Sequence, residues 1–183
     1  MTPTSSPERA YGLLLAAIRD PDPVVFLEPT RIYRSGKAEV NEDGESLPLD
    51  VAFVLREGSD VSLISWGATL KETLAAADTL AEEGIAAEVI DLATLKPYDE
   101  DTVLASVTKT GRCVIVHEAA RTGGFGAEIA ALIAERALLS LMAPVARVTG
   151  YDAIVPLPRL EQHYMPSVAR IADAARQCVG FSS

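Results

Sequence analysis

The sequence predicts an α/β protein in which an open, mostly parallel sheet is covered by helices on both faces. Strand-length apolar runs alternate with helical segments of about ten residues or more. Several of these runs carry no polar interruption, which is typical of parallel strands that are buried on both faces. The chain has 183 residues, of which 49% are hydrophobic and 23% charged, so it is long enough for one domain and a fraction of another.

The first predicted element is a helix from Pro7 to Arg19. Ser6 supplies a hydroxyl cap, and proline suits the first helical position. The helix must end at Asp20–Pro23, because a residue that precedes proline is pushed out of the helical region. Val24–Leu27 follows as a short apolar run, and we expect it to form a strand buried on both faces.

Residues 36–50 differ in composition from the rest of the chain and are predicted to be a linker. They include a predicted turn at Asp43-Gly44, several acidic residues and almost no large apolar ones. The alternative is a long solvated loop inside one domain, although such loops are uncommon in compact domains. The predicted organisation is therefore a first segment (1–35), a linker (36–50) and a main domain (51–183).

The main domain begins with two strands that are expected to run antiparallel, because the connection Arg56–Asp60 is too short for a parallel crossover. Three acidic residues, Asp99–Asp101, predict a helix start, and Gly111 predicts its end. The predicted strands are Val51–Leu55, Val61–Trp66, Ala87–Leu92, Arg112–Val116 and Ala146–Thr149. The predicted helices run over 69–83, 99–110, 124–141 and 166–178.

The charge and the cysteines exclude several classes of function. Subtracting 26 acidic residues from 16 basic ones gives a net charge of −10, which repels nucleic acids and anionic lipid surfaces and favours a basic protein partner. No apolar run reaches membrane-spanning length, and the first residues do not resemble a signal or transit peptide, so a cytoplasmic location is expected. Cys113 and Cys178 lie far apart without CxxC spacing and are expected to be small core residues in a reduced compartment.

The densest candidate site is the segment from His117 to Glu128, between a predicted strand and a predicted helix. Ligands of open α/β sheets bind at such positions, and a helix N-terminus attracts anions. The glycines fit neither GxGxxG nor a phosphate loop, and adjacent residues on an extended chain point in opposite directions. A structural or interface role is therefore favoured over catalysis. The candidate interface residues are His117, Glu118, Arg121, Gly123, Gly124, Phe125, Gly126 and Glu128.

Other chemistry has weaker support. The chain lacks a GxSxG elbow and has only two histidines, His117 and His163, so neither a hydrolase nor a histidine-rich metal site is indicated. Asp20 and Asp22 could supply oxygen ligands to a hard cation, but a turn that ends a helix is the commoner explanation. Trp66 is expected to be a packed interface residue at the end of a strand.

Several strings together resemble one family. They are Ala17–Pro29, Arg56–Val61, Glu88–Leu92, His117–Glu128 and Val148–Asp152. This ordered set resembles the β subunit of the E1 component of 2-oxo acid dehydrogenases of the pyruvate, branched-chain and acetoin type. The resemblance implies that residues 1–35 correspond to the end of a pyrimidine-binding domain. It also implies that residues 51–183 form a three-layer α/β/α transketolase C-terminal domain with an antiparallel edge strand.

The resemblance implies a reaction that these residues do not carry out themselves. In the family, thiamine diphosphate with Mg²⁺ decarboxylates a 2-oxo acid, and the acyl group passes to lipoyl groups on E2. The catalytic glutamate and histidine of the family β subunit lie upstream of the matching stretch. The α subunit holds the diphosphate through a Gly-Asp-Gly motif and asparagines, whereas this chain has one asparagine, Asn41. We therefore expect no catalytic or cofactor-binding residue in this chain, and no activity from it alone.

The resemblance also implies protein partners and a potassium ion. The partners are an E1 α subunit, a second β subunit and the subunit-binding domain of E2, whose basic character the acidic charge would complement. Ala17, Asp20 and Asp22 match an incomplete potassium site of some family members. Two alternatives stay open at this point: a stand-alone protein-interaction module without a catalytic role, and an unrelated nucleotide-binding α/β protein.

Overall fold

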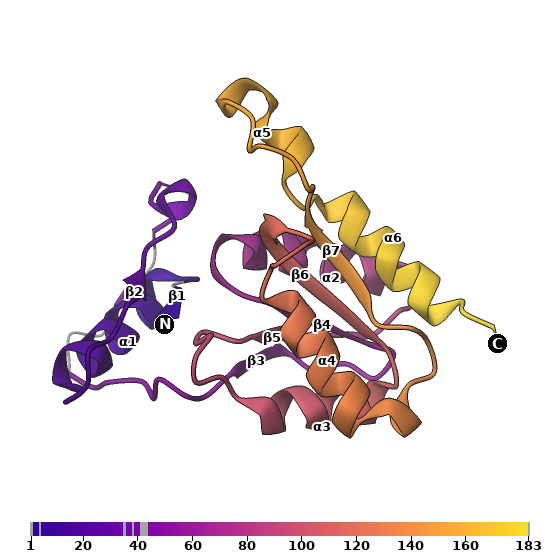
Figure 1. The fold of residues 1–183 in the computed structure, drawn as a ribbon, viewed down its shortest axis with the longest axis horizontal. Helices are drawn as coiled ribbons and strands as arrows, with labels where there is room; N and C mark the ends of the chain where they lie inside the picture. Colours follow the sequence, from indigo (N-terminus) through magenta and orange to yellow (C-terminus); the bar gives the residue numbers. More distant parts are fainter. Residues whose placement is uncertain (1, 4, 35, 38, 41–43, 183) are drawn as a thin grey trace.

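The structure is a computed structural model that describes residues 2–3, 5–34, 36–37, 39–40 and 44–182. Its main body is a five-stranded sheet with helices on both faces, and the N-terminal segment lies beside it (Figure 1). The strands are β3 (Phe53–Arg56), β4 (Val61–Ser65), β5 (Ala87–Asp91), β6 (Cys113–Ala120) and β7 (Ala146–Gly150). Their order is β3-β5-β4-β6-β7, with β3 antiparallel to β5 and every other pair parallel. The predicted α/β fold with an antiparallel edge strand is confirmed.

The order of the first strands differs from the simplest expectation. β3 and β4 run in opposite directions, as predicted, but β5 lies between them. The loop from β3 to β4 crosses the start of β5. There the amides of Ser59 and Asp60 both donate to the Ala86 carbonyl, at 3.0 and 2.9 Å. Gly58 permits this crossing, because a Cβ at that position would lie 2.3 Å from the backbone of β5.

Each face of the sheet has its own apolar core. One face packs against α2 (Leu70–Glu82) and α6 (Val168–Val179), and the other against α3 (Glu100–Thr110) and α4 (Gly126–Arg136). Cys113 and Cys178 are buried free thiols, as expected. A short helix that the sequence did not reveal, α5 (Pro158–Tyr164), precedes α6.

The helix boundaries follow their capping residues. The Asp99 carboxylate accepts from the Thr102 amide at 2.9 Å, and Gly111 ends α3 in the left-handed conformation at φ 67°. The helix predicted over 124–141 ends earlier, at Arg136, and a 3-10 turn, η3 (Leu138–Ser140), follows it. A second 3-10 turn, η2 (Gly67–Thr69), joins β4 to α2.

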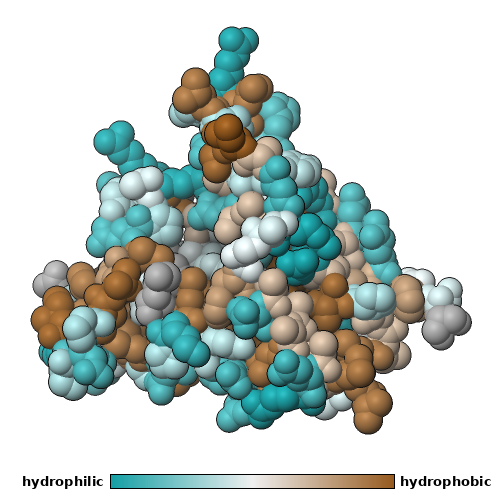
Figure 2. All heavy atoms as spheres, in the orientation of Figure 1, coloured by the Kyte–Doolittle hydropathy of each residue, from teal (hydrophilic) through white to brown (hydrophobic). Residues whose placement is uncertain are grey.

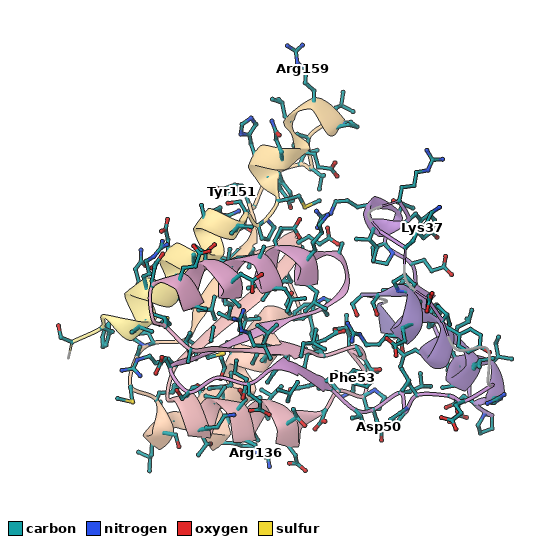
Figure 3. The ribbon with its side chains drawn as sticks, turned by 180° about the vertical axis from the view of Figure 1, so that it is seen from behind. Lys37, Asp50, Phe53, Arg136, Tyr151 and Arg159 are labelled. Atoms are coloured by element: carbon teal, nitrogen blue, oxygen red, sulfur yellow. The ribbon has the colours of Figure 1, made fainter. Side chains whose placement is uncertain are left out.

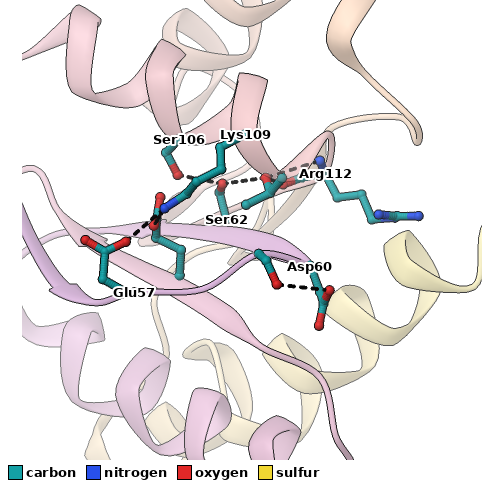
Figure 4. Close-up of polar contacts among 9 residues, drawn as sticks. Glu57, Asp60, Ser62, Ser106, Lys109 and Arg112 are labelled. Atoms are coloured by element: carbon teal, nitrogen blue, oxygen red, sulfur yellow. Dashed lines mark hydrogen bonds and ion pairs between the residues drawn. The ribbon is translucent and has the colours of Figure 1, made fainter.

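Polar groups near the amino end of β4 are paired although they are buried (Figure 4). The Ser62 hydroxyl lies 2.6 Å from that of Ser106 and 2.8 Å from that of Thr110. The Lys109 ammonium pairs with the buried Glu88 carboxylate of β5. Buried polar groups cost free energy unless they are paired. The pairing in this cluster therefore serves the stability of the fold, and no ligand is needed to explain it.

The N-terminal segment contains α1 (Pro7–Arg19), a two-stranded sheet of β1 (Thr2–Pro3) and β2 (Phe26–Leu27), and the turn η1 (Thr30–Ile32). The Ser6 hydroxyl caps α1, as predicted. The predicted strand Val24–Leu27 is shorter than expected, and its prediction as buried on both faces is wrong: Val25 is 55% exposed and Leu27 39%. The reason is that, among the residues the structure describes, β2 pairs only with β1 in a two-stranded sheet.

The segment between η1 and β3 has no helix or strand among its described residues. Ala38 and Asn41–Asp43, which belong to the predicted linker, lie outside the described residues, as does half of the predicted Asp43-Gly44 turn. The Leu47 amide donates to the Gly12 carbonyl of α1 at 3.0 Å, so this segment returns along α1. Within the described ranges, no helix is long and apolar enough to span a membrane.

Candidate functional site

The carboxyl ends of β4 to β7 meet at one edge of the sheet, because these strands are parallel. Trp66, Asp91 and His117 all lie at or next to this edge, which is where open α/β sheets bind ligands. In this protein the N-terminal segment packs against it. A cavity of about 280 Å³ between the two is lined by Leu27, Glu28, Pro29, Trp66, Gly67, Leu95 and Glu118.

His117 lies inside the protein rather than in this cavity. The residue is 1% exposed, and its ring stacks on the Trp66 ring, with 5.3 Å between the ring centroids and 17° between the ring planes. Neither ring nitrogen has a hydrogen-bond partner in the part of the chain that is described. Burial lowers the pKa of His117 to about 4, with the nearby Arg147 acting in the same direction. The imidazole is therefore neutral at neutral pH, and a solvent-borne substrate does not reach it.

The glycines of the candidate segment make room for this ring. A Cβ at Gly126 would lie 2.5 Å from His117 Nε2, and a Cβ at Gly124 would lie 2.6 Å from His117 Cε1. Phe125 lies between these glycines and packs edge-on against two rings. Its ring centroid is 5.9 Å from that of Trp66 and 5.3 Å from that of Tyr98. The geometry of Gly124–Gly126 is thus explained by close packing around His117, without a phosphate ligand.

β6 is longer than the predicted strand Arg112–Val116, which changes the placement of the candidate residues. It continues to Ala120 because it pairs with β7 as far as Gly150, through an irregular step after His117. His117 and Glu118 therefore lie within the strand and point to opposite faces, and Glu118 is half-buried. Burial raises the pKa of the Glu118 carboxyl; Arg31 opposes this, and the nearby Glu72 and Glu161 add to it.

The other candidate residues lie at the surface. Arg121 is exposed and donates to the Arg147 carbonyl at 3.2 Å, and Glu128 is exposed on the first turn of α4. Gly123 is also exposed, with φ at 73° and no atom near its Cβ position. The structure thus divides the predicted set. His117, Gly124 and Gly126 are buried together, whereas Arg121, Gly123 and Glu128 are exposed.

The three residues of the predicted potassium site lie at the end of α1. Asp20 and Asp22 are exposed, and the Asp22 amide donates to the Asp20 carboxylate at 2.9 Å, as in a turn that ends a helix. Ala17 is half-buried one turn earlier. Among the described residues, no group of three or more histidine, cysteine, aspartate or glutamate side chains could hold a metal ion.

Sequence reasoning missed Asp91, the buried carboxylate at the end of β5. Its side chain is fully buried and lies 3.1 Å from Arg9 Nε of α1, and it also accepts from the Ser5 hydroxyl and the Ala93 amide. Burial raises the pKa of Asp91, while Ser5 and Arg9 act in the opposite direction. The available signal was an aspartate directly after the apolar pair Val89-Ile90 at the end of a strand, and it indicates a polar contact across the edge of the sheet.

A second arginine joins the N-terminal segment to the main domain. Arg31 of η1 donates to both oxygens of Glu72 in α2, at 2.8 and 3.2 Å. Arg9 also lies over the Phe53 ring of β3, 5.8 Å from its centroid. Two arginine–carboxylate contacts and one cation–π contact therefore hold the segment at the carboxyl edge.

Replacing Arg9 tests this attachment. In Arg9→Met, the buried Asp91 carboxylate loses its counter-charge, and we expect docking of α1 to weaken by about 2 kcal/mol. Amide hydrogen exchange in α1 should then accelerate by about thirtyfold, as measured by mass spectrometry. The matched control is Arg56→Met, which breaks an ion pair to the well-exposed Asp78 and should leave α1 unchanged. Unchanged exchange in Arg9→Met would contradict this account of the attachment.

Comparison with known proteins places the main domain in a family. Residues 50–171 match the family model described as transketolase, C-terminal domain. The chain is 52% identical over 96% of its length to 2-oxoisovalerate dehydrogenase subunit beta 2, mitochondrial, of Arabidopsis thaliana, and covers 49% of that relative. It is 47% identical over 97% of its length to the pyruvate dehydrogenase E1 component subunit beta of Bacillus subtilis, and covers 54% of it. The chain thus spans about half the length of these relatives, which confirm the resemblance to E1 β subunits.

Solved structures agree with the family match. A split-gene transketolase, described as an inactive β4 tetramer, superposes with a TM-score of 0.68 at 30% identity, over 84% of this chain and 48% of the other. A transketolase variant from Pichia stipitis superposes with a TM-score of 0.52 over 71% of this chain and 18% of the other, and at 15% identity it shows the fold alone. With two thirds of its length matched by one family model, the chain belongs to the family of the transketolase C-terminal domain.

Proposed function

We propose that this chain is the C-terminal part of the β subunit of the E1 component of a thiamine-diphosphate-dependent 2-oxo acid dehydrogenase. Its role is subunit assembly and docking to E2, and it contributes no group to the decarboxylation. The observation that carries the proposal is the packing of the N-terminal segment against the carboxyl edge of the sheet, which leaves only a small cavity there and keeps His117 buried away from it. The high identity to two E1 β subunits supports the choice of enzyme class.

The described residues of this chain do not fit the cofactor. Thiamine diphosphate supplies the carbanion chemistry of such enzymes when it is bound with Mg²⁺ in the intact E1. A Mg²⁺ site uses carboxylates and other hard oxygen ligands, and no suitable cluster occurs among the described residues. For potassium we propose Ala17, Asp20 and Asp22 as an incomplete set of ligands, of which the Asp20 and Asp22 carboxylates are exposed.

The domain organisation and the partners belong to the same proposal. Residues 1–35 would form the end of a pyrimidine-binding domain, residues 36–50 a linker and residues 51–183 the transketolase C-terminal domain. The partners would be an E1 α subunit, a second β subunit and the E2 subunit-binding domain, in a cytoplasmic complex. The net charge of −10 supports a basic docking module. We further propose that the isolated chain associates with itself, as the β4 tetramer of the split-gene transketolase does.

Reconstitution tests the proposed division of roles. This chain, an E1 α subunit, thiamine diphosphate and Mg²⁺ should release CO₂ from pyruvate or 2-oxoisovalerate at below about one hundredth of the rate of the same α subunit with a full-length β subunit. In the same preparations, an isolated E2 subunit-binding domain should bind the chain, and more weakly at high salt. A comparable rate of CO₂ release would overturn the proposal, as would the absence of salt-sensitive binding.

A further inference from the structure

The N-terminal segment meets the main domain at η1 through a contact between charges. Arg31 of η1 donates to both carboxylate oxygens of Glu72 in α2, at 2.8 and 3.2 Å. Figure 3 shows the end of the N-terminal segment near Lys37 on the same side of the main body as Arg159, which follows β7 and lies in α5. On the face seen in Figure 2, this end of the N-terminal segment is mostly hydrophilic. The ionisation states of nearby groups therefore bear directly on how firmly η1 is held.

Several carboxylates surround the single guanidinium of Arg31. Glu161 of α5 lines a hollow of about 380 Å³ together with Arg31 and Glu72. Glu118 of β6 lines the cavity of about 280 Å³ at the carboxyl edge, together with Glu28. The pKa of Arg31 is raised, first by its hydrogen bond to Glu72 and also by the charges of Glu72, Glu118 and Glu161. Three carboxylates from three elements of the main domain thus face one cation, and negative charge is in excess.

Glu118 is the carboxylate of this group that is poorly compensated. It is half-buried, it shares its cavity with the apolar side chains of Trp66 and Leu95, and no hydrogen bond from a described residue reaches its carboxylate. A carboxylate in such surroundings is disfavoured in its charged form. Burial raises the pKa of the Glu118 carboxyl, and the Arg31 charge offsets only part of this effect.

The burial of Glu118 depends on the attachment of the N-terminal segment. Three residues that line its cavity, Leu27, Glu28 and Pro29, belong to that segment, and the others belong to the main domain. Detachment of the segment would open the cavity to water and take the Glu28 charge away from Glu118. The ionised carboxylate would then be hydrated, as in an ordinary exposed glutamate. Ionisation of Glu118 therefore favours the detached state, and protonation favours the attached one.

We propose that Glu118 makes the attachment of the N-terminal segment sensitive to pH, with the segment packing more tightly against the carboxyl edge when this carboxylate is protonated than when it is ionised. The attached state binds the proton more strongly than the detached state, so attachment strengthens as the pH falls toward the ordinary range of glutamate. Asp91, whose pKa burial also raises, acts in the same direction at the Arg9 contact. His117 acts in the opposite direction, on the whole fold, because burial lowers its pKa.

Hydrogen exchange of residues 24–34, measured by mass spectrometry, tests the proposal, because the exchange rate follows the opening of this segment. Glu118→Gln keeps the shape of the side chain without its charge, and exchange at pH 7.5 should become slower by about fivefold. Glu72→Gln removes the charge that pairs with Arg31, and exchange should become faster by about threefold. The matched control is Glu128→Gln, at an exposed carboxylate on α4, which should leave the rates unchanged.

The pH dependence gives a second measurement. Between pH 7.5 and 5.5, exchange of residues 24–34, corrected for the intrinsic rate of amide exchange, should slow in the parent and slow much less in Glu118→Gln. The dependence that remains in the variant reports Asp91. Exchange in Glu118→Gln that is not slower at pH 7.5, or an equal pH dependence in parent and variant, overturns the proposal. Neither result bears on the proposed function, which the CO₂ release assay decides separately.

Discussion

Gly126→Ala should lower the free energy of unfolding by about 2 kcal/mol. The added Cβ would lie 2.5 Å from His117 Nε2 and 3.1 Å from Ile115 Cγ2, and both neighbours are fully buried. Overpacking of a core costs about 3 kcal/mol at the upper end of its usual range. Alanine favours a helix over glycine by about 1 kcal/mol at most, so the steric term outweighs the helical preference at this first residue of α4.

Urea unfolding followed by circular dichroism measures the effect. Gly36→Ala is the matched control, because no atom lies within 4 Å of its Cβ position and its backbone is not left-handed. The control should stay within about 0.5 kcal/mol of the parent. Equal stabilities of the two variants would mean that the glycine at position 126 is not required by the His117 ring.

Acidification from pH 7 to 4 should cost the fold about 3 kcal/mol through His117 alone. Burial, assisted by Arg147, lowers the pKa of this imidazole from 6.5 to about 4 in the folded protein. The unfolded chain binds a proton below pH 6.5 and the folded chain does not, so stability falls as the pH decreases between these two values. The difference of about 2.5 units corresponds to about 3 kcal/mol at 1.36 kcal/mol per unit.

His117→Phe separates this contribution from those of the carboxylates. The variant keeps an aromatic ring beside Trp66 and cannot titrate, and the other ionisable groups are unchanged. Free energies of unfolding at several pH values should show the parent losing about 3 kcal/mol more than the variant between pH 7 and 4. Parallel pH profiles would show that His117 titrates normally and is accessible to solvent.

The fold was largely predictable because its signals are local. The apolar run at Val61–Ser65, the aspartate cap at Asp99 and the glycine end at Gly111 each specify a boundary through nearby residues. Strand order was not predictable in this way: β5 separates β3 from β4 because of a backbone crossing at Gly58. The exposure of β2 also escaped prediction, since the burial of a strand depends on which other elements pack against it.

The candidate site was predictable in part. The sequence indicated the segment from His117 to Glu128, but it could not show that the His117 ring fills the space left by two glycines, because that contact spans a strand and a helix. The Arg9–Asp91 pair joins residues 82 positions apart and has no local signature. The segment after Tyr151-Asp152 contains two prolines, Pro156 and Pro158, and only the structure shows that its apolar side chains stay exposed among the described residues.

The central claim is that His117 and the glycines of the candidate segment form a packed structural unit and not a catalytic or phosphate-binding one. A double-mutant cycle of His117→Ala and Gly126→Ala measures it most directly. If the glycine exists to admit the ring, the second substitution should cost almost nothing once the ring is gone, and the coupling energy should be about 2 kcal/mol. Additive losses, with coupling below about 0.5 kcal/mol, would contradict the claim.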